Sequence, residues 1–232
     1  MAAHPISSVR AVIFDFDMTL VDSSLAVTEC MNMMADAKGC RRVTREEMLA
    51  VIGKTLEDEW RLLWGRCEPD WLDYYRTSFV DAELGLIKEF EGTRPALSSL
   101  RELGIKIGVV SNRKYARRAV RLSGIADLTD VVIGLEDVTN PKPHPEPLLL
   151  ALERLSSPPD EAMYVGDTDI DVMTASAAGV YAAGVTTGNF DKKGLEAAGA
   201  AFVCSDLREL PEFLKSRVAF ANVKNIKNRQ EI

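Results

Sequence analysis

The chain has 232 residues, of which 47% are hydrophobic and 27% charged, and its formal net charge is -7. This composition fits a globular protein with a sizeable core, and the acidic balance disfavours broad binding to nucleic-acid phosphates. No apolar run approaches the roughly 20 residues that span a bilayer, and the four cysteines show no metal-binding or paired spacing. We therefore expect a cytoplasmic protein with reduced cysteines. We expect neither a nucleic-acid nor a membrane partner.

The first predicted element is a buried strand, Val12–Phe14, which leads directly into acidic residues. Asp15 and Asp17 follow it with one residue between them, and Thr19 continues the same spacing. Alternate residues of an extended chain face the same side, so these three side chains are expected to project together. Two neighbouring carboxylates destabilise a fold, and the carboxyl end of a strand is where open α/β sheets bind ligands. The stretch is therefore predicted to belong to a functional site.

The residues that follow have a helical pattern, with apolar side chains at steps of three and four. Thr44, with Glu47 three residues later, is typical of a helix N-terminus. All three tryptophans of the chain lie in this part, which predicts a small helical unit with a core of its own. The expected helices are Ser24–Lys38, Thr44–Ile52, Leu56–Trp64 and Asp70–Lys88.

From residue 93 onward, strands and helices alternate. The expected strands are Lys106–Val110, Val131–Ile133, Met163–Val165, Val180–Ala183 and Ala201–Val203. The expected helices are Pro95–Leu103, Arg113–Ser123, Pro147–Leu155, Ile170–Ala178, Lys193–Ala198 and Leu207–Val218. Such alternation favours parallel strands joined by right-handed helical crossovers, with helices on both faces. We expect an α/β fold with a doubly wound, mostly parallel sheet built from residues 1–21 and 93–232, and a helical insert at residues 22–92.

Two later segments carry groups that suit an anion. Ser111 and Asn112 directly follow a predicted strand, where a hydroxyl, backbone N–H groups and the next helix N-terminus can hold a phosphate. The same pair also occurs in ordinary helix caps. Lys142 lies in the proline-rich run 141–147, where the prolines prevent a helix before Pro147. Its ammonium on a stiffened loop can bind phosphate, and a solvated linker is the alternative.

A second acidic segment follows the predicted strand Met163–Val165. Asp167 and Asp171 are four residues apart, so they can face one point across a helical turn. Parallel strands place Asp15, Ser111, Lys142 and Asp167 at the same edge of one sheet. Several facing carboxylates require a counter-charge, and hard oxygen ligands without a cluster of His or Cys indicate Mg²⁺. Together with Lys142, Mg²⁺ can hold a phosphoryl group for transfer.

The motifs Asp-x-Asp-x-Thr, Ser, Lys and Gly-Asp-x-x-x-Asp, in this order, resemble those of the haloacid dehalogenase superfamily of phosphohydrolases. The segments Asp15–Ser23, Lys142–Pro147 and Val185–Gly188 are similar to its phosphoglycolate-phosphatase and β-phosphoglucomutase branch. The resemblance spans nearly the whole chain, and four ordered motifs at strand ends are much more specific than any one alone. It implies a Rossmann-like core with a helical cap of the C1 type.

The resemblance also implies residue roles. Asp15 corresponds to the nucleophile that forms an aspartyl-phosphate, and Asp17 to the general acid and base. Mg²⁺ is expected to be bound by Asp15, by Asp17 through its backbone carbonyl, by Asp167 and, through a water, by Asp171. Ser111, Asn112 and Lys142 are expected to bind the phosphoryl group. Lys54, on the turn where related caps carry a specificity loop, is a candidate contact for the rest of the substrate, or else a solvated lysine.

We therefore expect an Mg²⁺-dependent phosphatase, a phosphoric monoester hydrolase acting on a small phosphate ester such as phosphoglycolate or a sugar phosphate. A sugar phosphomutase would use the same residues, and a non-catalytic binding protein on the same fold is a further alternative. The family usually has glycine where this chain has Met18. Either the backbone conformation at this position tolerates a side chain, or Met18 narrows the pocket. A monomer or a weak homodimer is expected.

Overall fold

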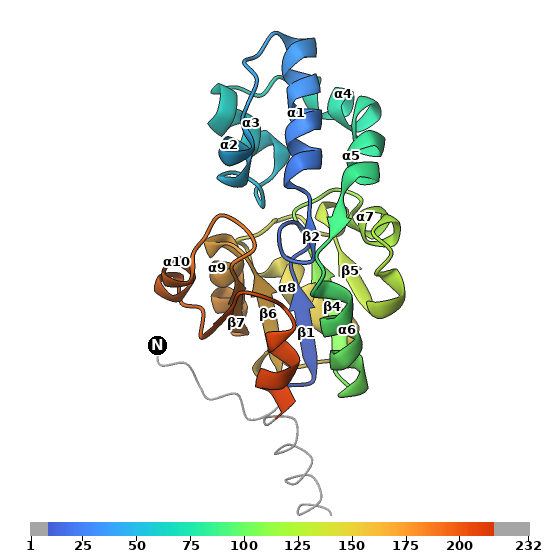
Figure 1. Cartoon of the computed structure of the whole chain (residues 1–232), viewed down its shortest axis with the longest axis vertical. Helices are drawn as coiled ribbons and strands as arrows, with labels where there is room; N and C mark the ends of the chain where they lie inside the picture. Colours follow the sequence, from blue (N-terminus) through green and yellow to red (C-terminus); the bar gives the residue numbers. More distant parts are fainter. Residues whose placement is uncertain (1–8, 216–232) are drawn as a thin grey trace, which may run out of the picture.

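The computed structural model describes residues 9–215. Its main sheet has six strands in the order β5-β4-β1-β6-β7-β8, and all neighbouring pairs are parallel (Figure 1). The strands are β1 (Ala11–Phe14), β4 (Lys106–Val110), β5 (Val131–Ile133), β6 (Ala162–Gly166), β7 (Tyr181–Val185) and β8 (Phe202–Cys204). Phe14 at the end of β1 pairs with Val109 on one side and Val165 on the other, so three strands end at the same level.

Helices cover both faces of this sheet because its strands are apolar on both sides. Val12 and Phe14 belong to one apolar cluster, whereas Ala11 and Ile13 belong to another on the opposite face. The first cluster includes residues of α6 (Thr93–Glu102) and α7 (Ala116–Leu122). The second includes residues of α8 (Glu146–Leu155), α9 (Asp169–Ala178) and α10 (Lys192–Ala198). Short 3₁₀ turns lie at η1 (Ala126–Leu128), η2 (Leu135–Asp137) and η3 (Pro159–Glu161).

A separate group of helices lies beyond one end of the sheet (Figure 1). These are α1 (Ser24–Lys38), α2 (Arg45–Leu49), α3 (Leu56–Trp64), α4 (Trp71–Ser78) and α5 (Val80–Leu86). They share an apolar cluster that includes Trp60, Trp71 and Tyr75, whose rings meet edge to face. The two chain connections to the sheet pair as short antiparallel strands, β2 (Val21–Asp22) and β3 (Lys88–Glu89). We propose that this group is the cap, with its boundaries near residues 22 and 92.

The predicted α/β fold with a doubly wound sheet is confirmed, and several element boundaries are corrected. The helix predicted over Asp70–Lys88 is two helices separated at Phe79, and Lys88 lies in a strand. The helix predicted from Arg113 begins at Ala116, because Tyr115 has a φ of 61° that a continuous helix does not allow. The last three residues of the predicted helix Leu207–Val218 lie outside the described residues.

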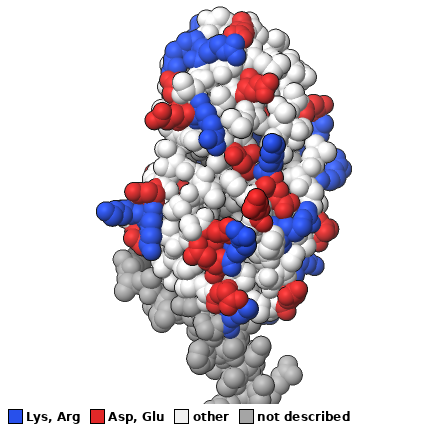
Figure 2. All heavy atoms as spheres, viewed as in Figure 1, with Lys and Arg blue, Asp and Glu red and all other residues white. Residues whose placement is uncertain are grey.

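The surface drawn in Figure 2 carries Lys and Arg interspersed with Asp and Glu, and no broad basic area is visible on that face. Within residues 9–215, no helix has the length and apolar character needed to cross a membrane.

Candidate active site

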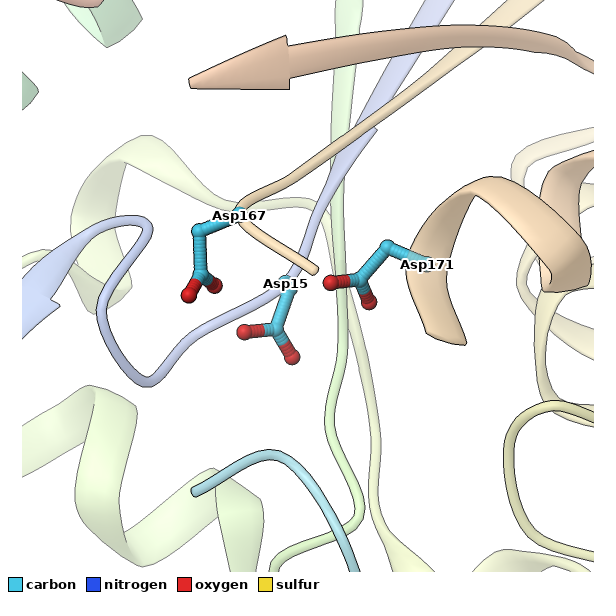
Figure 3. A group of neighbouring side chains, drawn as sticks. All are labelled: Asp15, Asp167 and Asp171. Atoms are coloured by element: carbon cyan, nitrogen blue, oxygen red, sulfur yellow. The ribbon is translucent and has the colours of Figure 1, made fainter. Parts of the chain in front are cut away.

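Three carboxylates from different parts of the fold converge at the carboxyl end of the central strands. Asp15 directly follows β1, Asp167 directly follows β6, and Asp171 lies in the first turn of α9. One carboxylate oxygen from each lies within 4.8 Å of the other two, and all three residues are buried. Their carboxylates point toward one another (Figure 3). The backbone N–H of Asp15 donates to the carbonyl of Val165 at 2.8 Å, which extends the strand pairing into the site.

Two glycines make room for these carboxylates. A Cβ at Gly188, in the loop after β7, would collide with the side chain of Asp167. A Cβ at Gly166 would collide in the same way with the side chain of Asp171. Only glycine therefore allows the backbone to come this close to the two acids.

Lys142 supplies the positive charge in this cluster. Its Nζ donates to Asp15 Oδ1 at 2.6 Å, to Asp171 Oδ1 at 2.7 Å and to the Tyr164 hydroxyl at 3.1 Å. Although burial opposes the charged form, the carboxylates of Asp15 and Asp171 raise the pKa of the Lys142 ammonium above its ordinary value. One buried cation therefore faces a group of three buried acids.

The single charge of Lys142 does not balance the negative charge of the three carboxylates. Burial, together with the charges of Asp171 and Asp17, raises the pKa of Asp15 to about 7 even though Lys142 lowers it. Burial and the neighbouring charges of Asp171 and Asp15 also raise the pKa of Asp167. Acidic groups that hold their protons this strongly in the free protein are a favourable site for a cation, whose charge would stabilise their ionised forms. The donor set is all oxygen, which fits Mg²⁺.

The carboxylates are held in place by neighbouring hydroxyl groups. Thr19 Oγ1 donates to Asp167 Oδ1 at 3.0 Å. Thr168 Oγ1 donates to Asp171 Oδ2 at 2.7 Å, and the Tyr164 hydroxyl contacts Asp171 Oδ1 at 3.1 Å. The backbone N–H of Thr168 also donates to Asp171 Oδ2, at 3.2 Å, as in a capping box at the start of α9. The spacing of Asp167 and Asp171 is thus set by the helix start.

Ser111 and Asn112 lie where β4 ends, next to this cluster. Ser111 Oγ accepts a hydrogen bond from the backbone N–H of Arg113 at 3.1 Å. The Asn112 amide group donates to the carbonyl of Lys142 at 3.1 Å and accepts from its backbone N–H at 2.9 Å. The same amide donates to the carbonyl of Gly53 in the cap at 3.0 Å. The Asn112 side chain therefore positions the Lys142 loop and ties it to the cap.

Asp17 makes an ion pair that the sequence did not reveal. Arg113 donates to both of its carboxylate oxygens, with Nη2–Oδ1 and Nε–Oδ2 distances of 2.6 and 3.1 Å. A third guanidinium nitrogen contacts Glu83 of α5, which accepts from the Tyr75 hydroxyl at 2.6 Å. Burial opposes ionisation of Asp17, but the guanidinium outweighs it and lowers the pKa of this carboxyl.

Arg113 directly follows Ser111-Asn112, and this position next to a predicted phosphate-binding pair is the one feature of the sequence that points to Arg113 as a site residue. Its two acidic partners lie 96 and 30 residues away along the chain, so a single sequence offers no sign of the pairing.

A cavity between the sheet and the helical group connects these residues. Its walls include Asp15, Asp17, Ser111 and Asn112 from the sheet side. Lys54 and neighbouring residues of α3, α4 and α5 line the cap side. The backbone N–H of Lys54 donates to the carbonyl of Val51 at 3.3 Å, whereas its ammonium makes no hydrogen bond or ion pair with another residue of 9–215. The predicted site residues are therefore brought together, and Lys54 faces them from the opposite wall.

Met18 has a backbone conformation that suits glycine. Its φ is 59°, in the left-handed region, and its side chain is buried among the apolar residues of the cap cluster, with an exposure of 2%. The side chain thus joins the loop after β1 to the cap core. Of the two alternatives at this position, a tolerated side chain and a narrowed pocket, this packing supports the tolerated side chain.

Comparisons with known proteins agree with this geometry. The model of the family described as haloacid dehalogenase-like hydrolase matches residues 12–185. Pyrophosphatase PpaX of Bacillus pumilus is 34% identical over 181 residues, which make up 77% of this chain and 84% of that protein. PpaX of Bacillus cereus strain B4264 is 29% identical over 210 residues, 90% of this chain and 97% of that protein.

Solved structures agree as well. A haloacid dehalogenase-like protein from Bacteroides fragilis has a TM-score of 0.80 at 35% identity, covering 88% of this chain and 100% of its own. A hydrolase of the same superfamily from Geobacter sulfurreducens has a TM-score of 0.72 at 28% identity, covering 89% and 100%. The resemblance and the enzyme class predicted from the sequence, a phosphoric monoester hydrolase of this type, are confirmed. The chain belongs to the haloacid dehalogenase-like hydrolase family.

Proposed function

We propose that the protein is an Mg²⁺-dependent phosphatase that hydrolyses a small phosphate ester through an aspartyl-phosphate on Asp15. The observation that carries this proposal is the convergence of Asp15, Asp167, Asp171 and Lys142 in one buried cluster, of which Asp15 lines the cavity. A carboxylate nucleophile needs no separate base once it is ionised.

The cation has a defined place in this proposal. Asp15, Asp167 and Asp171 would hold Mg²⁺, together with the backbone carbonyl of Asp17. The ion would lower the pKa of the Asp15 carboxyl and offset charge on the phosphoryl oxygens. Lys142 and Ser111 would bind the remaining phosphoryl oxygens, and Asn112 would keep Lys142 in position.

Asp17 would transfer the protons of the reaction. In the free protein its carboxylate is bound by Arg113 and ionised, which is the form that accepts a proton from an attacking water. Donating a proton to a leaving alcohol requires the protonated form, so Asp17 must first separate from Arg113. Because Arg113 also contacts Glu83 of α5, we propose that movement of the cap accompanies this separation.

The test is phosphate release from p-nitrophenyl phosphate and from a panel of phosphorylated metabolites, with Mg²⁺ or with EDTA. We expect turnover by the wild type with Mg²⁺, and a loss of at least about 1,000-fold in Asp15→Asn, because an amide is not a nucleophile. Asp160→Asn, on the exposed surface, is the matched control and should retain full activity. Comparable turnover by Asp15→Asn would refute the assigned nucleophile.

The leaving group remains to be identified by that panel. Phosphoglycolate and sugar phosphates are the esters that the sequence resemblance favours, and pyrophosphate enters the panel because two relatives are named pyrophosphatases. A monomeric or weakly dimeric state and a cytoplasmic location stay predictions.

A further inference from the structure

A buried tyrosine lies behind the acidic cluster and takes no part in the proposed chemical steps. Tyr164 is on β6 and is 1% exposed, and its ring packs among the apolar residues of the sheet face covered by α8, α9 and α10. Its hydroxyl contacts Lys142 Nζ at 3.1 Å, Asp171 Oδ1 at 3.1 Å and the carbonyl of Val110 at 3.2 Å. These groups come from the proline-rich loop, the start of α9 and the end of β4, so one hydroxyl connects three segments of the site.

All three N–H groups of the Lys142 ammonium make hydrogen bonds in the free protein. An ammonium group has three donors and no acceptor. The acceptors are Asp15 Oδ1 at 2.6 Å, Asp171 Oδ1 at 2.7 Å and the Tyr164 hydroxyl at 3.1 Å. Lys142 can therefore bind a phosphoryl oxygen only by giving up one of these three hydrogen bonds.

The position of the cavity indicates which hydrogen bond is exchanged. Of the three acceptors, Asp15 lines the cavity, whereas Asp171 and Tyr164 are not among the described residues of its wall. A phosphoryl group that enters from the cavity can therefore replace Asp15 as the acceptor, while Asp171 and Tyr164 hold the ammonium from the interior side. Asp171 is also a proposed ligand of Mg²⁺, which leaves Tyr164 as the interior partner of Lys142 that does not compete with the ion.

The hydroxyl suits this position because it is neutral. Burial raises the pKa of Tyr164 well above its ordinary value, so the hydroxyl keeps its proton. A neutral acceptor fixes the direction of the ammonium without cancelling its charge, and that charge stays available to a phosphoryl group.

We propose that Tyr164 is a positioning residue of the phosphatase reaction, and that its hydroxyl holds the Lys142 ammonium in the direction of the phosphoryl group. This inference rests on the proposed phosphatase function and adds a residue to it. The ring of Tyr164 would pack in the same way in a purely structural role, so the hydroxyl is the part of the side chain that an experiment must change.

Tyr164→Phe removes the hydroxyl and keeps the ring. The experiment measures kcat and KM for p-nitrophenyl phosphate with Mg²⁺, and the inhibition constant of inorganic phosphate as a competitive product. We expect kcat/KM to fall about tenfold and the inhibition constant to rise at least about threefold, because a misdirected ammonium makes a weaker charge-assisted hydrogen bond. Tyr181→Phe, which removes the hydroxyl of a half-buried tyrosine on the neighbouring strand β7, is the matched control and should change neither value.

A double-mutant cycle separates positioning from a structural role. In the Lys142→Met background, Tyr164→Phe should have little further effect on the residual turnover of p-nitrophenyl phosphate, because the hydroxyl has no ammonium left to direct. An equal loss in both backgrounds would show that Tyr164 acts independently of Lys142 and would overturn the inference. Wild-type values of kcat/KM and of the inhibition constant in Tyr164→Phe would overturn it as well.

Thermal unfolding of the same four proteins without Mg²⁺ gives a readout that does not depend on turnover. The decrease in melting temperature caused by Tyr164→Phe should be smaller in the Lys142→Met background, and strictly additive decreases would overturn the inference. If Tyr164→Phe does not fold, Tyr164→Met takes its place, and failure of both to fold would assign the hydroxyl to the fold instead. A wild type that hydrolyses no phosphate ester would overturn the phosphatase function and this inference together.

Discussion

Arg113 forms buried ion pairs with both Asp17 and Glu83. Its side chain is 15% exposed, and it contacts both carboxylates. Removing one partner of a buried ion pair costs about 3–5 kcal/mol, because the remaining charge is left unpaired in the interior. Arg113 therefore stabilises the fold while it holds Asp17 ionised.

We predict that Arg113→Met lowers the free energy of unfolding by about 3–5 kcal/mol at neutral pH, measured by urea denaturation. The double variant Arg113→Met/Glu83→Gln should be less destabilised than Arg113→Met, because one of the two unpaired charges is then absent. A double variant that is destabilised by the sum of the two single changes would show that Arg113 and Glu83 are not coupled.

The packing of the Met18 side chain stabilises the fold, whereas the left-handed backbone conformation of this residue is strained. Truncation of a buried Met to Ala costs about 2–5 kcal/mol. At most buried positions glycine is worse still, but here glycine relieves about 1–2 kcal/mol of left-handed strain. We predict that Met18→Gly is at least as stable as Met18→Ala in urea denaturation. A clearly less stable glycine variant would contradict a strained backbone at this position.

The sequence predicted most acidic and phosphate-binding positions because they follow predicted strands. Asp15, Ser111 and Asp167 each lie at a strand end, and parallel pairing brings such positions together without further information. Arg113 could not be assigned in this way, because its role depends on Glu83, which the cap brings opposite the sheet.

At the scale of elements, the predicted core strands and helices are present because their apolar periodicity is strong. Lys106–Val110 and Val131–Ile133 have the predicted boundaries. The cap is less regular, and the predicted helix Asp70–Lys88 is interrupted at Phe79, whose φ of -125° and ψ of -23° are not helical. No glycine or proline marks the interruption, so the sequence carries no local signal for it. The pairing of β2 with β3 is also non-local.

For the molecule as a whole, the acidic cluster makes stability depend on both pH and cation. The pKa of Asp15 is raised from 3.8 to about 7 in the folded protein, and that of Asp167 is raised as well. Between pH 3.8 and about 7, Asp15 of the folded state holds a proton that the unfolded chain has released. The contribution of Asp15 to stability therefore decreases as the pH rises and is lost above about pH 7, and that of Asp167 decreases in the same direction.

We predict that saturating Mg²⁺ raises the melting temperature more at about pH 8 than at about pH 5, because protons compete with the ion for the carboxylates at low pH. Thermal unfolding in Mg²⁺ and in EDTA at both pH values measures this difference. Asp167→Asn should reduce the effect of Mg²⁺, whereas Asp160→Asn should not. An equal effect of Mg²⁺ at both pH values would argue against binding at the cluster.

The most direct test of the account is to look for the phosphoryl group on Asp15 itself. During turnover of a phosphate ester with Mg²⁺, an acid quench followed by peptide mass spectrometry should find one phosphoryl group on the peptide that contains Asp15, and none in Asp15→Asn. Wild-type protein that turns over its substrate while phosphorylated at another residue, or at none under rapid quench, would contradict the account.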